Sequence, residues 1–213
     1  MFITSYAPYG ADGIIIRVEA DIRRGIPGAD ITGLAQAAVR EARERARAAF
    51  RNSGFDFPKD RVLINLAPAG VRKDGASLDL PIALAVMAAA GAIPPPDDLM
   101  ALGELELSGG LRPVRGVLAA IAGGLASGMK GFIVPAENAA EARILAKDKI
   151  AAVATLKEAA EAVVHYARNG VFPSGMHVQQ REASALQTAW GDFDEVRGQG
   201  RYKRALEIAA AGG

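Results

Sequence analysis

The segment DLPIALAVMAAAG, residues 79–91, constrains the fold more than any other, because a helix built from it is apolar on nearly every side. Asp79 suits the N-cap, where a carboxylate accepts a backbone N–H. Pro81 is tolerated in the first turn, since its missing donor would lie unpaired there anyway. We therefore predict a helix over residues 79–90. A surface helix keeps a polar face, so this helix must be covered on all sides by other elements.

Segments with strand patterns alternate with segments of helical periodicity along the first 169 residues. Strands are predicted over 13–22, 61–68, 131–135 and 150–154, and helices over 36–52, 116–127, 137–147 and from Thr155 onward. The stretch 23–35, punctuated by Gly and Pro, predicts a loop, and 99–114 predicts a hairpin that turns at Ser108-Gly109-Gly110. This alternation predicts an α/β fold with a mixed sheet over residues 1–169.

The rest of the chain differs in kind. Residues 170–190 are polar with scattered glycines and no sustained period, which predicts a linker. Residues 191–213 regain a helical pattern with one apolar face, formed by Ala205, Leu206, Ile208 and Ala209. A lone helix of this length is marginal in water. We therefore expect this segment to open a second domain.

Charge and residue inventory exclude several classes of site. The formal net charge is +1, so any surface for nucleic acid or anionic lipid must be local. The chain has no cysteine, which excludes disulfides, thiolate metal sites and cysteine nucleophiles, and with two distant histidines no metal site is expected. The first residues lack the basic and apolar regions of a secretory leader. We expect a cytoplasmic protein without membrane association.

Ser77 lies on a Gly-bearing turn before the apolar helix, a position that suits a nucleophile if a base can take its proton. The bases available are few. His165 and His177 are the only histidines, and no lysine lies between Lys73 and Lys130. A lone histidine is more often a surface or core residue than a partner of a distant serine.

The sequence KDGAS around Ser77 resembles the segment that holds the catalytic serine of the Lon proteases. Residues 103–135 resemble the Lon segment that carries the partner lysine. An ungapped comparison places Leu118 at the position of that lysine, and a leucine cannot accept a proton. We therefore expect Ser77 to support the turn and no catalytic residue in this chain, with a Ser77-dependent peptidase as the alternative.

Several blocks in order resemble the amino-terminal domain of the ComM/YifB family of Mg-chelatase-like ATPases, namely GIPG (25–28) and the segments 31–58, 64–91 and 103–118. The most specific block is K-x-G-x-x-x-D-L-P-I-A, whose structural motif residues here are Lys73, Gly75, Asp79 and Pro81. The resemblance implies a Lon-protease-like fold of the ribosomal protein S5 domain 2 type without the catalytic dyad, that is, a non-catalytic Lon-like (ChlI-like) domain over residues 1–169.

The segment DFDEVRGQGRYKRALEIAAAGG (192–213) resembles the opening of the AAA+ module in the same family. The resemblance places Val196, Arg197, Gly198 and Gln199 at the edge of an adenine site. A helix start with Gly198 as a turn is the alternative. No G-x-x-x-x-G-K-[ST] phosphate loop occurs in the chain. We expect no cofactor and no ATP hydrolysis in these 213 residues, whereas the resemblance implies ATP and Mg²⁺ for a full-length protein.

The resemblance further implies a homo-oligomeric, hexameric ring that drives DNA branch migration in natural transformation, with this chain contacting its own AAA+ domain. A basic stripe at helical spacing, formed by Arg40, Arg43, Arg47 and Arg51, is the candidate contact for DNA or a neighbouring subunit. Pairing of Glu41 with Arg45 and of Glu44 with Arg47 would leave a solvated face instead. A subunit of a protoporphyrin Mg chelatase is a further alternative, although no tetrapyrrole site is evident.

Overall fold

The computed structural model describes residues 1–8, 13–33, 37–71, 73, 76–95, 97–173 and 197–212, with the backbone alone at 37–40. Its contacts divide the chain into two units, residues 1–178 and 179–213. The first unit holds every strand described below. The second contains helix α6 (Gly200–Ala211).

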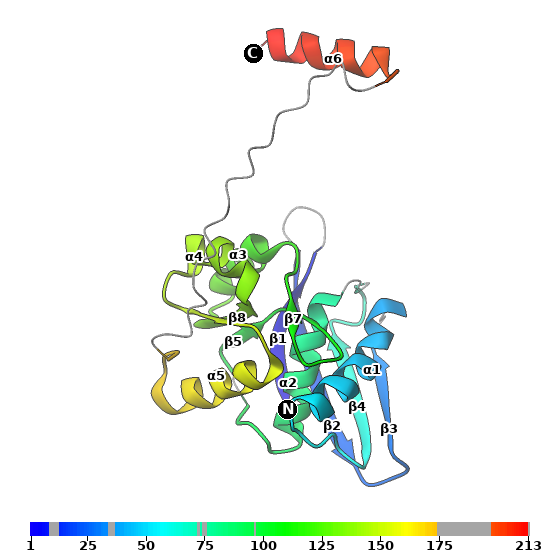
Figure 1. Ribbon diagram of the computed structural model, residues 1–213, viewed down its shortest axis with the longest axis vertical. Helices are drawn as coiled ribbons and strands as arrows, with labels where there is room; N and C mark the ends of the chain where they lie inside the picture. The colour runs from blue at the N-terminus through cyan, green and yellow to red at the C-terminus, as the bar shows by residue number, and fades with distance from the viewer. Residues whose placement is uncertain are drawn as a thin grey trace. The chain divides into compact units, whose positions relative to one another are not determined.

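A seven-stranded mixed sheet runs through the first unit in the order β3-β4-β2-β1-β5-β8-β9 (Figure 1). The strands are β1 (Phe2–Ala7), β2 (Ile14–Arg23), β3 (Gly28–Thr32), β4 (Arg61–Ala67), β5 (Leu99–Ala101), β8 (Gly131–Pro135) and β9 (Ile150–Val153). β1 pairs antiparallel with β2, and β2 with β4, whereas the other neighbours are parallel. A separate hairpin joins β6 (Glu104–Leu105) to β7 (Leu111–Arg112). The mixed α/β class is thereby confirmed.

The helices of the first unit follow the predicted alternation. They are α1 (Ala37–Asn52), α2 (Asp79–Ala89), α3 (Val117–Ala126), α4 (Ala139–Ala146) and α5 (Leu156–Asn169), with short 3₁₀ turns η1 (Ala76–Leu78) and η2 (Ala136–Asn138). Thr155 caps α5 as expected, because its side chain accepts a hydrogen bond from the Glu158 N–H at 3.2 Å. Gly170 ends α5 in the left-handed conformation.

The predicted loop over 23–35 is wrong in its second half, because Gly28–Thr32 forms the edge strand β3. Its register sets Ala29 beside Val62 and Ile31 beside Ile64 of β4. Glycine and proline around the segment obscure its short alternation. The edge strand exists because β4 offers an unpaired side, a condition that only the assembled sheet creates.

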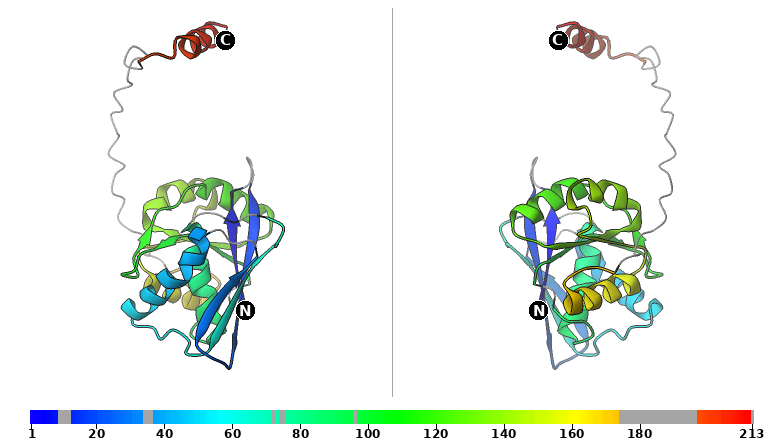
Figure 2. Two further views of the ribbon diagram at one scale, coloured as in Figure 1. Left: turned by 90° about the vertical axis from the view of Figure 1, so that its right-hand side faces the viewer. Right: turned by 90° about the vertical axis from the view of Figure 1, so that its left-hand side faces the viewer.

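Helix α2 is buried along its length, as its all-apolar surface predicts. Every residue from Asp79 to Ala88 is buried. The helix packs on β2 and β1 with one side and on α1 with the other, so α1 forms an outer layer over it. Figure 2 shows these two helices on the same face of the strands. The central helix therefore serves as the main core element of the unit.

The two halves of the sheet are covered differently. Strand β8 is buried at all five positions: Ile133 belongs to the core around α2 and α5, while Phe132 belongs to a second core with α3 and α4. Strand β2 alternates instead, with Arg17 and Asp21 exposed between buried Ile16, Val18 and Ala20. Helix α3 contacts that face at the start of β2, where Ile15 packs beside Gly123, whereas Arg17 and Asp21, further along the strand, are exposed. Continuous apolar strands are typical of sheets buried on both faces, and alternating ones of sheets with a solvated face.

Helix α6 has no buried residue in its own unit. Its large apolar side chains are exposed, at 72% for Tyr202, 51% for Leu206 and 57% for Ile208. Across the described segments, no helix has both the length and the apolar character needed to cross a membrane.

Candidate functional site

Ser77 lies in η1, immediately before α2, with its side chain partly buried. Its carbonyl oxygen accepts a hydrogen bond from the Gly103 N–H at 3.0 Å, and the Gly103 carbonyl accepts one from the Leu80 N–H at 3.0 Å. These two bonds join the turn to the segment after β5. Among the residues that the structure describes, none forms a hydrogen bond with the Ser77 hydroxyl. The hydroxyl is therefore not activated by a described base.

Lys73 is fully buried and serves as a tie between loops. Its Nζ donates to the carbonyl of Gly33 at 2.8 Å and to the carbonyl of Pro68. Burial lowers the pKa of the Lys73 ammonium, because the charged form loses hydration. The ammonium therefore donates its hydrogen bonds to two backbone carbonyls and not to Ser77. Gly75, the second residue of the motif, lies outside the described residues.

Leu118 occupies the first turn of α3 and is partly buried. Its N–H donates to the Glu141 carboxylate at 3.3 Å, so the helix start is stabilised by a neighbouring acidic side chain. The isobutyl group carries no proton acceptor. Nothing in this geometry supplies the lysine of a Ser-Lys pair.

Asp79 was predicted to cap α2, and this prediction is wrong. Leu78 occupies the N-cap without a side-chain hydrogen bond, and Asp79 is the first helical residue. Its fully buried carboxylate receives two bonds from Arg45 of α1, at 2.7 Å from Nε and 2.9 Å from Nη2. It also accepts the Leu105 N–H of β6 at 3.2 Å. The cap preference is local, and here a partner 34 residues away along the chain overrides it.

The Arg45–Asp79 pair ties α1, α2 and β6 together. Burial raises the pKa of the Asp79 carboxyl, and the hydrogen bonds from Arg45 and Leu105 oppose that rise. The same hydrogen bond raises the pKa of Arg45, whose side chain remains 22% exposed. Pro81 is buried in the first turn of α2, as predicted. The pair was not predicted from the sequence, although Arg45 and Asp79 lie in the blocks 31–58 and 64–91 named above.

In the predicted basic stripe on α1, some arginines bond other groups of the protein and others have no ion pair with a described residue. Arg43 donates from Nη1 to the Ala29 carbonyl at 2.7 Å and pairs through Nε with Glu44 at 2.8 Å. The predicted Glu41–Arg45 pair is present at 3.6 Å. Glu44 pairs with Arg43 rather than with Arg47. The side chain of Arg40 lies outside the described part of the chain.

Arg47 and Arg51 are exposed, and neither has an ion pair with any residue that the structure describes. The Arg47 guanidinium lies over the Phe57 ring, 5.4 Å from its centroid. Both arginines line a surface cavity of about 470 Å³, together with Gly54, Phe55, Asp56 and Phe57. The aromatic side of this cavity was not predicted from the sequence. The signal for it is GFDFP (54–58), which directly follows the arginine stripe.

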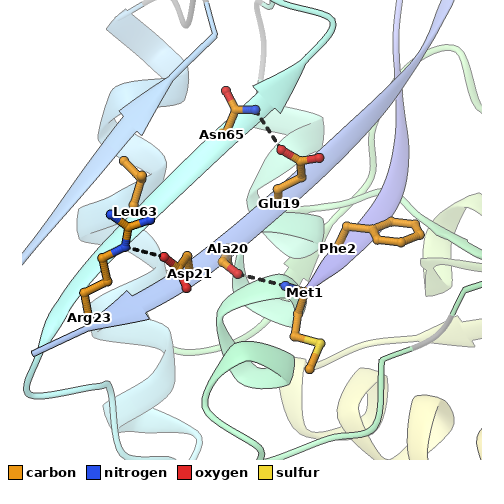
Figure 3. Close-up of a pocket in the computed structure, with 8 residues that line it drawn as sticks. All are labelled: Met1, Phe2, Glu19, Ala20, Asp21, Arg23, Leu63 and Asn65. Carbon is orange, nitrogen blue, oxygen red and sulfur yellow. Dashed lines mark hydrogen bonds and ion pairs between the residues drawn. The ribbon is translucent and has the colours of Figure 1, made fainter.

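A second cavity, of about 260 Å³, lies near the N-terminus on the face of the sheet opposite α2 (Figure 3). Its polar groups bond one another. The Met1 amine donates to the Ala20 carbonyl at 3.0 Å, Asn65 donates to Glu19 at 2.8 Å, and Arg23 donates to Asp21 at 2.6 Å. These groups therefore offer little unsatisfied capacity to a ligand.

The residues predicted at the nucleotide edge lie in the second unit, before α6. Gly198 and Gln199 both have left-handed backbone, with φ of 74° and 57°, and Gln199 is the N-cap of the helix. Arg197 precedes them, while Val196 is outside the described residues. These residues form a turn into a helix and do not by themselves enclose a base. No group of acidic or histidine side chains suited to a metal ion occurs within the described residues.

Comparison with known proteins agrees with this architecture. The family model described as subunit ChlI of Mg-chelatase matches residues 18–138. The YifB protein of Salmonella typhimurium is 38% identical over 213 residues, covering 97% of this chain and 40% of the relative. The competence protein ComM of Haemophilus influenzae is 33% identical over 221 residues, covering 99% of this chain and 41% of the relative. This chain thus spans about 40% of the length of such relatives.

The Lon protease of Trichlorobacter lovleyi is 26% identical over 133 residues, covering 59% of this chain and 16% of the protease. Together with the mixed sheet and its flanking helices, this similarity confirms the predicted Lon-protease-like fold. The similarity to YifB and ComM extends over nearly the whole chain, whereas the similarity to Lon covers a shorter part.

Proposed function

Since the chain belongs to the family of the ChlI subunit of Mg-chelatase, we propose that it is the substrate-side and assembly domain of a ComM-type AAA+ ATPase that moves DNA branch points. ATP and Mg²⁺, a hexameric ring and DNA are parts of this proposal for a whole protein. The chain would contribute the rigid Lon-like domain and the helix that opens the motor module.

One observation carries the proposal: the similarity to ComM continues past the Lon-like domain through α6. A protein that shared only a Lon-like fold would not share that segment. The exposed apolar side chains of α6 also suit a helix that packs on further chain, since a lone helix gains little stability in water. The same near-complete similarity favours a ComM-type motor over a protoporphyrin chelatase subunit.

The native gene product provides the test. It should be purified from its source, its intact mass measured, and its ATPase activity assayed with and without a four-way DNA junction. We expect ATP-dependent movement of the junction, and DNA that raises the rate of ATP hydrolysis. A product that binds the junction but neither hydrolyses ATP nor moves the branch point would overturn the proposal.

The peptidase alternative can be tested on the 213-residue chain itself. We expect no labelling of Ser77 by a fluorophosphonate probe, because no described base contacts its hydroxyl. Ser77→Ala should change the melting temperature by no more than about 3 °C, as expected for a partly buried hydroxyl that bonds no described residue. Labelling of wild type that disappears in Ser77→Ala would support a peptidase instead.

A further inference from the structure

We propose that Arg47, Arg51 and the Phe55–Phe57 loop bind the backbone and a base of single-stranded DNA. This inference rests on the proposed function for its choice of DNA, but the site is argued from the geometry of this chain. It also assigns the contact to two arginines of the basic stripe and excludes Arg43 from it.

The choice of arginines follows from their partners. Arg43 bonds a backbone carbonyl and Glu44, so its guanidinium is already satisfied within the protein. Arg47 and Arg51 lie four residues apart, on one face of α1. No other described residue forms an ion pair with them. Their N–H donors are therefore available to a ligand.

The aromatic loop holds one of these arginines in place. Phe50, buried in the core, makes edge contacts with Phe57 at 5.2 Å and Phe55 at 6.4 Å between ring centroids. These contacts position the Phe57 ring against the Arg47 guanidinium. This cation–π contact is made with the ring face, and no described hydrogen-bond acceptor pairs with the N–H donors of Arg47. Arg47 is thus partly organised before any ligand binds.

The space beside this pair exceeds that of a single phosphate. The cavity of about 470 Å³ shares its lining residues Phe55, Asp56 and Phe57 with a second cavity of about 690 Å³. Lys59 and Asp60 line the second cavity as well. Ligand sites in proteins commonly have volumes of roughly 300 to 1,000 Å³. The cavity beside Arg47 and Arg51 lies within this range, so it has room for more than a phosphate group.

The combination of arginine and phenylalanine side chains at this site favours a single strand of DNA as the ligand. Planar guanidinium forks suit phosphate oxygens, and partly exposed phenylalanine rings suit the flat face of a base. A duplex would keep its bases stacked away from the rings, so a single strand fits better. The lining carries Arg47, Arg51 and Lys59 against Asp56 and Asp60, which weakens the attraction for anions. Binding should therefore be micromolar and salt-dependent.

The test uses the 213-residue chain with a fluorescent 20-nucleotide oligo-dT and a matched duplex, measured by anisotropy over a range of salt. The test variant is Arg47→Gln/Arg51→Gln. The control is Arg24→Gln/Arg115→Gln, which removes the same charge from two exposed arginines that have no ion pair with a described residue. A further variant, Phe57→Leu, removes the ring and keeps an apolar side chain. Melting curves check that each variant is folded.

We expect the test variant to bind oligo-dT at least about tenfold more weakly and to lower the slope of log K against log salt by about 1.4, the value for two lost phosphate contacts on a single strand. The control should change binding less than about threefold. Phe57→Leu should weaken binding with little change in the salt slope, because it removes no charge. Duplex should bind more weakly than oligo-dT.

Equal losses in the test and control variants would overturn the inference, as would wild type that does not bind oligo-dT. Loss of self-association on sizing chromatography in the test variant alone, with oligo-dT binding unchanged, would identify an acidic surface of a second copy as the occupant and would also overturn it. The proposed function is judged separately by branch migration of the native product. Either result can fail while the other holds.

Discussion

Replacing Arg45 by methionine should lower the free energy of unfolding by about 3 to 5 kcal/mol, the usual effect of leaving a buried charge without its partner. The Asp79 carboxylate is 0% exposed and depends on Arg45 for two of its hydrogen bonds. Among the described residues, Leu105 alone would then remain hydrogen-bonded to the carboxylate. Urea unfolding followed by far-UV circular dichroism measures the loss.

The loss should grow as pH rises. The folded-state pKa of Asp79 already lies above that of an unfolded aspartate, about 3.9, and removing Arg45 raises it further. The folded state then holds the Asp79 proton more tightly than the unfolded state. The stability that this proton contributes to the variant is therefore fully present below pH of about 4. It is lost as pH rises through the folded pKa. The difference between variant and wild type should therefore be larger at pH 8 than at pH 5.

The paired variant Arg45→Met/Asp79→Leu separates a lost charge partner from a general loss of packing. Well-packed apolar replacements of buried ion pairs are often neutral or stabilising, so the double variant should recover most of the stability. A double variant as unstable as the sum of its single variants would show that the two residues act independently. A single variant without pH dependence would contradict the assignment to Asp79.

Replacing Gly33 by alanine should lower the free energy of unfolding by about 3 to 5 kcal/mol, through two effects that add. The residue has φ of 93°, which disfavours any side chain. An added Cβ would also lie 2.2 Å from the Leu66 carbonyl oxygen, a backbone atom of β4 that cannot move without disturbing the sheet. A backbone shift at this position would also displace the Gly33 carbonyl, which accepts a hydrogen bond from the Lys73 ammonium.

Gly91→Ala is the matched control for Gly33→Ala. Gly91 also has positive φ, 74°, but an added Cβ there meets no atom of the described residues within 4 Å. Gly91→Ala should lower the free energy of unfolding only by the cost of left-handed backbone in a residue with a Cβ, about 1 to 2 kcal/mol. Thermal and urea unfolding of the two variants compare the costs directly. Equal costs would mean that β4 accommodates the extra methyl group.

Local patterns were enough to predict most elements of the first unit. The periods of apolar side chains in 61–68 and 131–135 are properties of neighbouring residues, and they correspond to β4 and β8. The burial of α2 was predictable in the same way, because its residues are apolar on nearly every side. Edge strand β3 was not predictable from its residues alone, because its hydrogen bonds depend on a strand about 30 positions further along the chain.

The candidate site shows the same division. The sequence by itself determined that the chain has few bases for Ser77, a leucine at position 118 and a row of arginines on one helix. Only the tertiary structure decided which partners these side chains have. Arg45 pairs with Asp79, and Arg43 bonds the Ala29 carbonyl and Glu44. Arg47 and Arg51 lie instead beside Phe55 and Phe57. Residue type and spacing set what a side chain can bond. Which partner it bonds depends on segments that folding brings within about 3 Å of it, since hydrogen bonds form only at that range.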